Sequence, residues 1–376
     1  AAVWKRSDGK ALRIARSGRA ETAAPRRILR FFGRTLLLFF TVVLVLCATL
    51  LASLRLICSN VSPAAKRVFV TTMLETGQLK FLASLLVSQD EIRALVASNA
   101  LAEFNDSVDS SLITVGVSSD DTVQGEQPPQ PDIAVEKISG RTFLGTMILL
   151  KDPSRLSVAS IYPWREKGVT LDTLVKDSGA VGGINAGIYN STNNTGGKPY
   201  GIVVCGGEIQ FNQPEQFPGL VMIGLTEDNI LQIVDINGKT AAQVESLVRE
   251  MKIRDAIAFQ EESTDANNHF VQLVINGEAR ELNGMGSGLN PRTAIGQRKD
   301  GTLLLLVTDG RGRNGHLGAS ASDLIDIMVE YGAVNAANLD GGSSSCMYLN
   351  GEYLMDSVTF YYTNSSWRMP TAFVIH

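Results

Sequence analysis

The sequence predicts an α+β (mixed α/β) fold, in which a strand-rich globular domain with two or more packed helices follows a transmembrane helix and a helical stalk. Three observations predict it. An uncharged apolar run lies near the N-terminus, a helical pattern follows it, and after Ser139-Gly140 short β-branched runs alternate with Gly, Asn and Asp turns. With 376 residues the chain can bury a sizeable core.

Residues 1–34 are predicted to be a basic cytoplasmic tail. They contain ten lysines and arginines but only two acidic residues, Asp8 and Glu21. Such a tail could bind nucleic acid, but it runs directly into the apolar segment, so membrane topology explains it better. Nucleic acid is therefore not expected as a partner.

Residues 35–56 are predicted to be a transmembrane helix. The run from Thr35 to Leu54 carries no charge and has the ~20 residues that a helix needs to cross a bilayer. A cleaved secretory signal is the competing interpretation, but its apolar core usually has only about 7–15 residues. The basic residues before the span predict a single-pass type II protein of the cell membrane, with the rest of the chain extracytoplasmic.

Residues 57–102 are predicted to form the helical stalk. Ser62-Pro63 begins a helical pattern that runs to about Val87, and Ser88 with Glu91 forms a capping box that opens a second short helix.

Residues 103–138 are predicted to be a flexible linker, because every charge from Glu103 to Glu136 is acidic and prolines cluster there. The globular domain is expected to occupy residues 139–376 and to fold without the linker, from a start near Val135.

Within the domain, two helices and a series of strands are expected. Thr240 caps the first helix and Ser320 precedes the second, which Gly332 ends. The predicted strands are Thr146–Leu150, Gly201–Cys205, Leu220–Gly224, Leu231–Ile236, Phe270–Ile275, Thr302–Thr308, Ala333–Asn338 and Thr371–Ile375.

The domain contains two cysteines, Cys205 and Cys346. Outside the cytoplasm they could form one disulfide, and two buried free thiols are the alternative. The sequence does not decide between them.

Polar motifs follow or open the apolar strands, where catalytic residues are often held by a rigid sheet. These motifs are Asn185-Ala186-Gly187-Ile188-Tyr189, Asn290-Pro291-Arg292-Thr293, Thr308-Asp309-Gly310-Arg311 and Asn338-Leu339-Asp340-Gly341-Gly342-Ser343-Ser344.

Together these residue types suit an anionic sugar derivative. Arg292 and Arg311 supply planar forks for a phosphate, and the glycines at 341–342 allow backbone N–H groups to approach an anion. Asp309 and Asp340 supply carboxylates for work at a sugar carbon. Each motif alone could be structural, since Asp-Gly is a common turn and an arginine often pairs with a neighbouring carboxylate.

No metal site or other cofactor is predicted, although a divalent cation is not excluded. His269 and His316 are isolated from other ligand types in the sequence, and Gly341-Gly342-Ser343 lacks the lysine of a nucleotide-binding loop.

From Gly140 to His376 the sequence resembles the phosphodiester glycosidases related to the mannose 6-phosphate uncovering enzyme. The motifs around Arg292, Asp309 and Asp340 carry the resemblance, together with Arg368 near the closing strand. The resemblance implies removal of a sugar that is linked through its anomeric carbon to phosphate. In a bacterium the corresponding substrate would be a cell-surface glycopolymer or glycoconjugate.

On this resemblance, Asp340, Asp309 and Arg292 are the expected catalytic residues. The expected substrate-binding residues are Asn185, Gly187, Tyr189, Thr293, Arg311, Asn338, Gly341, Gly342, Ser343, Ser344 and Arg368. Two small departures bear on the sugar that fits: Ser343 stands where the family usually has a third glycine, and Ala186 where it often has glycine.

The sequence therefore predicts a membrane-anchored extracytoplasmic hydrolase of sugar-1-phosphodiesters. The alternative is a non-catalytic module that binds or helps to assemble an anionic surface polysaccharide. A carboxylate beside a bound phosphate costs electrostatic energy in a mere binder, which favours the enzyme.

Overall fold

The computed structural model describes residues 23–59, 61–76, 79–98, 107–116, 132–263, 268–359 and 364–376. Most of the predicted basic tail and much of the predicted linker lie outside these residues. The chain divides into two compact units, residues 1–61 and 62–376, which are described separately.

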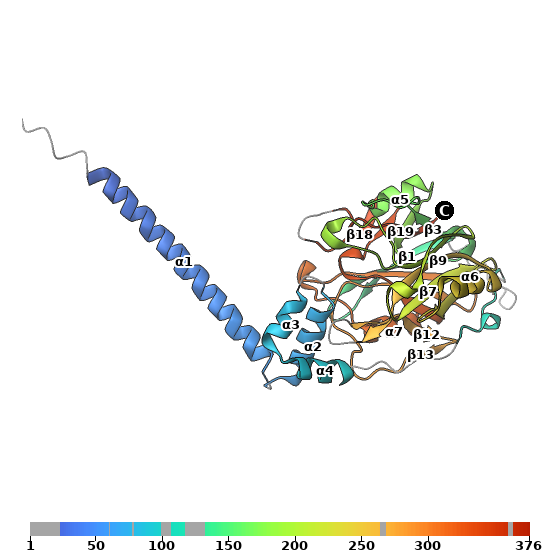
Figure 1. The fold of residues 1–376 in the computed structure, drawn as a ribbon, viewed down its shortest axis with the longest axis horizontal. Coiled ribbons are helices and arrows are strands. Elements are labelled where there is room, and N and C mark those ends of the chain that lie inside the picture. Colours follow the sequence, from blue (N-terminus) through green and yellow to red (C-terminus); the bar gives the residue numbers. More distant parts are fainter. Residues whose placement is uncertain are drawn as a thin grey trace, which may run out of the picture. The chain divides into compact units, whose positions relative to one another are not determined.

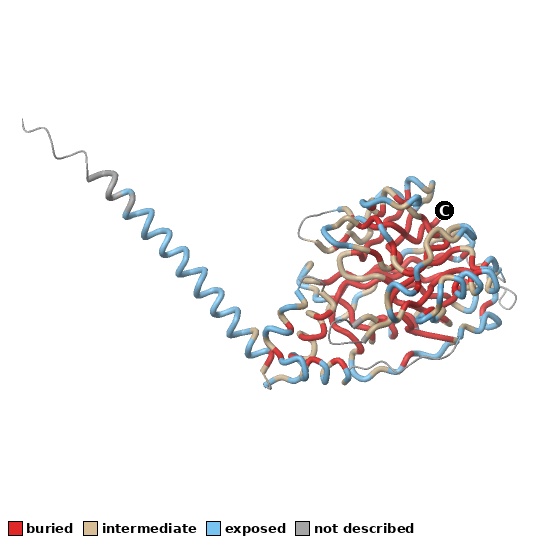
Figure 2. Tube along the Cα trace, in the orientation of Figure 1, coloured by how far each residue is buried: buried red, intermediate tan, exposed pale blue. Residues whose placement is uncertain are grey.

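The first unit contains helix α1, Ala23–Ile57 (Figure 1). Most of its described apolar side chains between Ile28 and Ile57 are exposed, and Leu54 is half-buried (Figure 2). The part from Arg30 to Ile57 is long and apolar enough to cross a bilayer, and a signal sequence near an N-terminus would have the same character. The predicted apolar helix is thus present.

The second unit begins with three short helices, α2 (Pro63–Leu74), α3 (Lys80–Leu86) and α4 (Gln89–Ser98). The predicted caps are present, because Ser62 accepts a hydrogen bond from the Ala65 N–H and Ser88 accepts one from the Glu91 N–H. The helix expected to continue to Val87 instead ends at Leu74, with Glu75 as its C-terminal cap.

Part of the predicted linker is a strand. Residues Ile133–Ser139 form β1, which pairs along its whole length with β2 (Leu144–Leu150). The acidic composition of residues 103–138 suggested disorder, but Ile133 packs on the main core and the backbone bonds to β2 fix the strand. An ordered 3-10 turn, Ser110–Leu112, lies in the same stretch.

The strands of the described residues form three large sheets. The first has seven strands in the order β1-β2-β15-β14-β16-β12-β13. The bounds of those not yet given are β12 Gln272–Ile275, β13 Glu278–Ala279, β14 Thr293–Arg298, β15 Leu303–Thr308 and β16 Ala333–Asn338.

The other two sheets have five strands each, in the orders β18-β17-β4-β19-β3 and β6-β5-β9-β7-β8. Their bounds are β3 Leu156–Ser160, β4 Gly182–Asn185, β17 Met347–Leu349, β18 Glu352–Met355, β19 Thr371–Ile375, β5 Gly201–Cys205, β6 Glu208–Gln213, β7 Leu220–Thr226, β8 Leu231–Asp235 and β9 Ile253–Gln260. A small hairpin, β10 (Glu262–Ser263) with β11 (Asn268–His269), stands apart from them.

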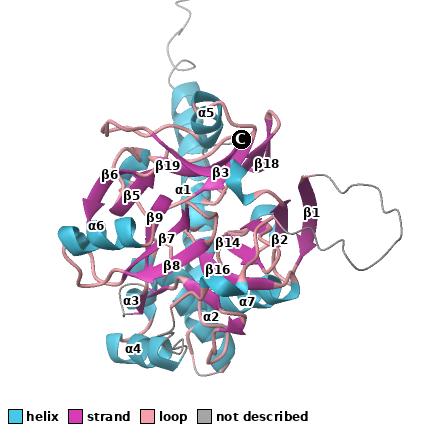
Figure 3. Cartoon of the chain, turned by 90° about the vertical axis from the view of Figure 1, so that its right-hand side faces the viewer, coloured by secondary structure: helices cyan, strands magenta, loops and turns pink. Residues whose placement is uncertain are grey.

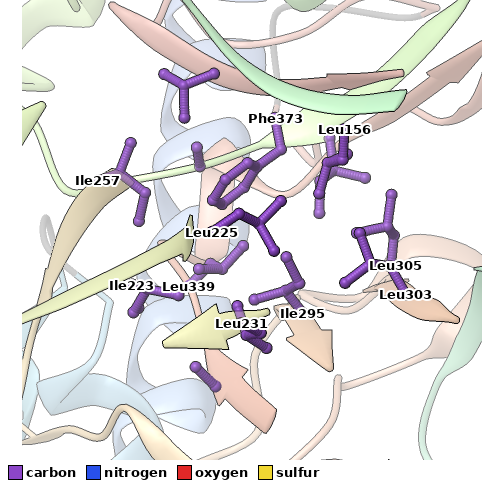
Figure 4. Close-up of a cluster of buried hydrophobic side chains, with 14 of the residues drawn as sticks. Leu156, Ile223, Leu225, Leu231, Ile257, Ile295, Leu303, Leu305, Leu339 and Phe373 are labelled. Carbon is purple, nitrogen blue, oxygen red and sulfur yellow. The ribbon is translucent and has the colours of Figure 1, made fainter. Parts of the chain in front are cut away.

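The three sheets share one central core, and each has its own helix on the outer face (Figure 3). Figure 4 shows side chains from all three sheets in this core, among them Leu305, Ile257 and Phe373. The outer helices are α5 (Leu171–Asp177) on the β4/β19 sheet, α6 (Ala241–Glu250) on the β5/β9 sheet and α7 (Ala321–Glu330) on the seven-stranded sheet.

The predicted α+β class is therefore confirmed. Helices α6 and α7 begin at the predicted caps, Thr240 and Ser320, each with a reciprocal capping box. Helix α5 and several strands were not predicted. Cys205 and Cys346 are both free thiols in the structure, of which Cys346 is buried and Cys205 only half-buried.

Candidate active site

The predicted site motifs gather where two sheets meet. Strand β14 is antiparallel to both β15 and β16, with Thr293 opposite Val307 and Ala294 opposite Asn338. The start of β14 therefore lies beside the ends of its two neighbours. The end of β4, in a different sheet, reaches the same place through the side chain of Asn185.

Asn185 is buried and connects the two sheets. Its Oδ1 accepts hydrogen bonds from Thr293 Oγ1 at 2.7 Å and from the Cys346 N–H at 3.1 Å. Its Nδ2 donates to the backbone carbonyl of Asp340 at 2.6 Å. The preceding residue, Leu339, is buried in the central core. Asp340 is therefore held by this neighbour and by the hydrogen bond from Asn185 to its backbone carbonyl.

Asp340 carries the most perturbed carboxyl group of the cluster. Burial raises its pKa to about 7, against the opposing effects of hydrogen bonds from Ser344 and the Gly341 N–H and of the charge on Arg311. Tyr189, which is buried, shares a 2.9 Å hydrogen bond between its hydroxyl and Ser344 Oγ. A carboxyl group that titrates near neutral pH is suited to acid/base work.

Arg311 faces the glycine-serine loop that follows Asp340. Its Nη1 donates to Ser343 Oγ at 2.8 Å and its Nε to Asn290 Oδ1 at 3.3 Å. The backbone of Arg311 has a φ of 54°, which is uncommon for a residue with a side chain. Gly342 has a φ of 65°, which side chains rarely adopt, and a Cβ there would lie 2.5 Å from Arg311 Nη2, so glycine favours the close approach.

The pKa of Arg311 is lowered to about 10, first by burial and then by the positive charge of Arg292. Asp340 and Glu75 oppose this shift. Arg311 thus remains a cation at neutral pH, within reach of the charges of a second arginine and two carboxylates.

Arg292 is buried, and its guanidinium stacks over the Phe270 ring with 4.9 Å from Cζ to the ring centroid. Its Nε donates to the Ala319 carbonyl at 3.2 Å. Its Nη2 donates to Ser287 Oγ and the Gly288 carbonyl, and also forms an ion pair with Glu75. Arg292 is therefore held in one orientation before any ligand binds.

Glu75 is the site residue that sequence reasoning missed. Its side chain, only 3% exposed, belongs to the end of α2 in the predicted stalk. Besides pairing with Arg292, the carboxylate accepts hydrogen bonds from the Gly288 N–H at 2.7 Å and from Asn290 Nδ2 at 3.2 Å. One signal was available: a carboxylate at a helix C-terminus opposes the helix dipole and needs a cationic partner.

The contacts of Asp309 are with residues outside this cluster. Its carboxylate accepts a hydrogen bond from the Leu144 N–H at 2.8 Å and lies 2.7 Å from His316 Nδ1. Both oxygens thus tie the end of β15 to the start of β2 and to the following loop. These contacts do not test the catalytic role expected for Asp309, which stays a prediction.

Three further predicted residues can be placed: Asn338 lies at the site, whereas Gly187 and Arg368 do not contact the cluster. The Nδ2 of Asn338 donates to the Phe270 carbonyl and its Oδ1 is buried without a hydrogen-bond partner among the described residues. Gly187 serves packing, since a Cβ there would lie 2.8 Å from the Ala258 carbonyl oxygen. Arg368 is exposed and contacts Asn194 and Gly168 instead of the cluster.

In the part of the chain that the structure describes, no three His, Cys, Asp or Glu side chains gather in a way that could hold a metal ion.

A comparison with protein families decides which family the chain belongs to. The sequence profile of the phosphodiester glycosidases matches residues 178–376. The chain belongs to the phosphodiester glycosidase family. The matched region contains Asn185, Arg292, Arg311 and Asp340, whereas Glu75 lies outside it.

Two curated phosphodiester glycosidases are similar to parts of the chain. N-acetylglucosamine-1-phosphodiester alpha-N-acetylglucosaminidase of Bos taurus is 31% identical over 134 residues, which cover 30% of this chain and 25% of that protein. The Mus musculus enzyme of the same name is 24% identical over 253 residues, covering 63% and 45%. The chain thus spans less than half the length of these relatives.

A solved structure supports the fold. The catalytic domain of the zebrafish enzyme of the same name, described as auto-inhibited by its pro-peptide, aligns with a TM-score of 0.51 at 18% identity. The alignment covers 66% of this chain and 85% of that one. At this identity the likeness concerns the fold alone.

Proposed function

We propose that this phosphodiester glycosidase hydrolyses sugar-1-phosphodiesters, with Asp340 acting at the anomeric carbon and the two arginines binding the phosphate. The observation that carries the proposal is that Asp340 and Arg311 lie together where β14 begins and β15 and β16 end, in a buried place that raises the pKa of the Asp340 carboxyl group. The names of the curated relatives suggest N-acetylglucosamine as the first sugar to test.

The chemistry follows from the leaving group. When the bond between the anomeric carbon and the phosphate oxygen breaks, the phosphate departs with the electron pair as a stable anion, so it needs little acid assistance. The ionised form of Asp340 is therefore the useful one, as a base toward water or as a nucleophile. Arg292 and Arg311 stabilise the charge that develops on the phosphate.

A module that only binds an anionic polysaccharide would need the arginines but not Asp340. Burying a carboxylate in such a site weakens the attraction for phosphate, because like charges repel strongly where water is excluded. The Asp340 contacts therefore favour hydrolysis over mere binding.

The proposal places the domain outside the cytoplasm, anchored through α1, and acting on a cell-surface glycopolymer or glycoconjugate. The ten basic residues before the apolar run support this orientation.

The test uses phenyl diesters of N-acetylglucosamine 1-phosphate, glucose 1-phosphate and mannose 1-phosphate, incubated with the detergent-solubilised chain in ¹⁸O-labelled water. We expect free sugar together with phenyl phosphate that carries no ¹⁸O, because a glycosidase breaks the carbon–oxygen bond. Labelled phenyl phosphate would instead show attack at phosphorus. Binding of the diesters without release of any sugar would support the binding module.

A further inference from the structure

We propose that Glu75 is a positioning residue of this active site, which orients Arg292 directly and Arg311 through Asn290 so that both can bind one phosphate. The inference rests on the proposed function, since it assigns the arginines to an anionic substrate. It makes α2, a helix of the predicted stalk, part of the site.

The direct contact is with Arg292. Glu75 pairs with Nη2, while Nε is held by the Ala319 carbonyl. Nη1 has no hydrogen-bond partner among the described residues, so fixing the other two nitrogens leaves this one for a ligand.

The indirect contact passes through the amide of Asn290. A carboxylate can only accept hydrogen bonds, so Glu75 draws the Nδ2 side of the amide toward itself. The Oδ1 side then faces Arg311, whose Nε donates to it at 3.3 Å. With Nη1 on Ser343, Arg311 keeps Nη2 without a partner within the described part of the chain.

Each arginine thus keeps one terminal guanidinium nitrogen that has no hydrogen-bond partner among the described residues. These are Nη1 of Arg292 and Nη2 of Arg311. A phosphodiester has two non-bridging oxygens that share its negative charge, and each could accept a hydrogen bond from one guanidinium. We expect the orientation set by Glu75 to match this pair of acceptors.

Electrostatics supports the same role. The positive charge of Arg292 lowers the pKa of Arg311, whereas the negative charge of Glu75 raises it. Two guanidinium groups in a buried site repel each other, and a fixed carboxylate in contact with one of them offsets the repulsion. Removing that charge should let the arginines move apart.

Helix α2 also contacts the loop that contains Gly288 and Leu289, through a hydrogen bond that involves neither arginine. Thr72 Oγ1 accepts a hydrogen bond from the Leu289 N–H at 3.0 Å, and a Cβ at Gly288 would lie 2.4 Å from the Thr72 backbone nitrogen. Thr72→Val removes the hydroxyl but keeps the shape, so it is the matched control for docking alone.

The experiment compares the 376-residue chain with its Glu75→Gln and Thr72→Val variants. Calorimetry measures the binding of phenyl phosphate, kinetics with the hydrolysed phenyl diester give kcat and KM, and thermal melting reports stability. For Glu75→Gln we expect roughly tenfold weaker phenyl phosphate binding and a similar rise in KM, with a smaller fall in kcat, the scale of a lost charged hydrogen bond. Thr72→Val should lower the melting temperature and leave binding within about twofold of the wild type.

Four results would overturn the inference. Tighter binding by Glu75→Gln would show that Glu75 competes with the ligand for Arg292. Equal losses in both variants would show that only helix docking matters. A wild-type chain that binds no phenyl phosphate, or a Glu75→Gln variant with unchanged binding, would also exclude the role. If the wild type binds phenyl phosphate but cleaves no diester, the proposed function fails while the binding comparison still tests Glu75.

Discussion

Replacing Asp340 by asparagine should stabilise the protein while it damages catalysis. Burial raises the pKa of this carboxyl group from 3.8 to about 7, so the folded chain holds the proton more tightly than the unfolded chain. The stability contributed by the protonated form is fully present below pH 3.8 and is lost as the pH rises through about 7. A shift of this size corresponds to about 4 kcal/mol when complete, and to about 2–3 kcal/mol of the change between pH 5 and pH 8.

Asparagine cannot ionise, but its oxygen can still accept the hydrogen bonds that Ser344 and the Gly341 N–H give to Asp340. The variant should therefore gain stability relative to the wild type as the pH rises. Urea unfolding of both chains at pH 5, 6, 7 and 8, followed by tryptophan fluorescence, measures this difference. A difference in unfolding free energy that stays constant over this range would refute the assignment of a near-neutral pKa to Asp340.

The catalytic effect provides the second half of the same prediction. Asp340→Asn should lower kcat by roughly 10²-fold or more and leave KM largely unchanged. In the wild type, kcat should fall as the pH drops below about 7, because the ionised carboxylate is the active form. Full activity in a folded Asp340→Asn protein would exclude this residue from the chemistry.

Three further predictions concern Arg292, the helices before the domain, and topology. Arg292→Lys should raise KM and lower kcat, each by roughly tenfold, because lysine lacks the planar fork of the guanidinium group. Steady-state kinetics measures both constants. The control is Arg368→Lys at an exposed position, which should change neither. A chain that begins at Val135 loses part of β1 and also Glu75, the carboxylate partner of Arg292. It should melt at a lower temperature than a chain that begins at Ser62, because breaking a buried ion pair costs about 3–5 kcal/mol. Equal melting temperatures would contradict this. Protease added outside intact cells should digest the domain and leave a small membrane fragment, and complete protection would exclude the type II orientation.

The sequence predicted those parts of the fold that depend on local patterns. Strands β5, β16 and β19 have the expected bounds, and Thr240 and Ser320 cap helices as expected. β1 was assigned to a linker because its composition resembles that of disordered segments. Its order comes from pairing with β2, which no local pattern of charges reveals.

The site was predictable where its residues stand at strand ends. Antiparallel pairing brings Arg292 and Asp340 to one edge, and strand-end motifs reveal this from the sequence. Glu75 could not be found in this way, because its partner Arg292 is more than half the chain away in sequence and only the docking of α2 brings them together. Asp309 stands in an equally promising motif, but its carboxylate contacts Leu144 and His316 and not the cluster, so its catalytic role stays a prediction.

The order of strands in the β18-β17-β4-β19-β3 sheet sets a limit on when the domain can fold. β19 lies between β4 and β3, which are translated long before it, so β3 has no partner strand, and β4 has only β17, until Thr371–Ile375 has been synthesised. Until then the apolar inner faces of β3 and β4 lack Phe373 and Ile375, and their edges are open to pairing with other chains. If the domain crosses a membrane during synthesis, it should complete its folding only after translocation of this strand, and chaperone dependence should be greatest for chains halted just before it.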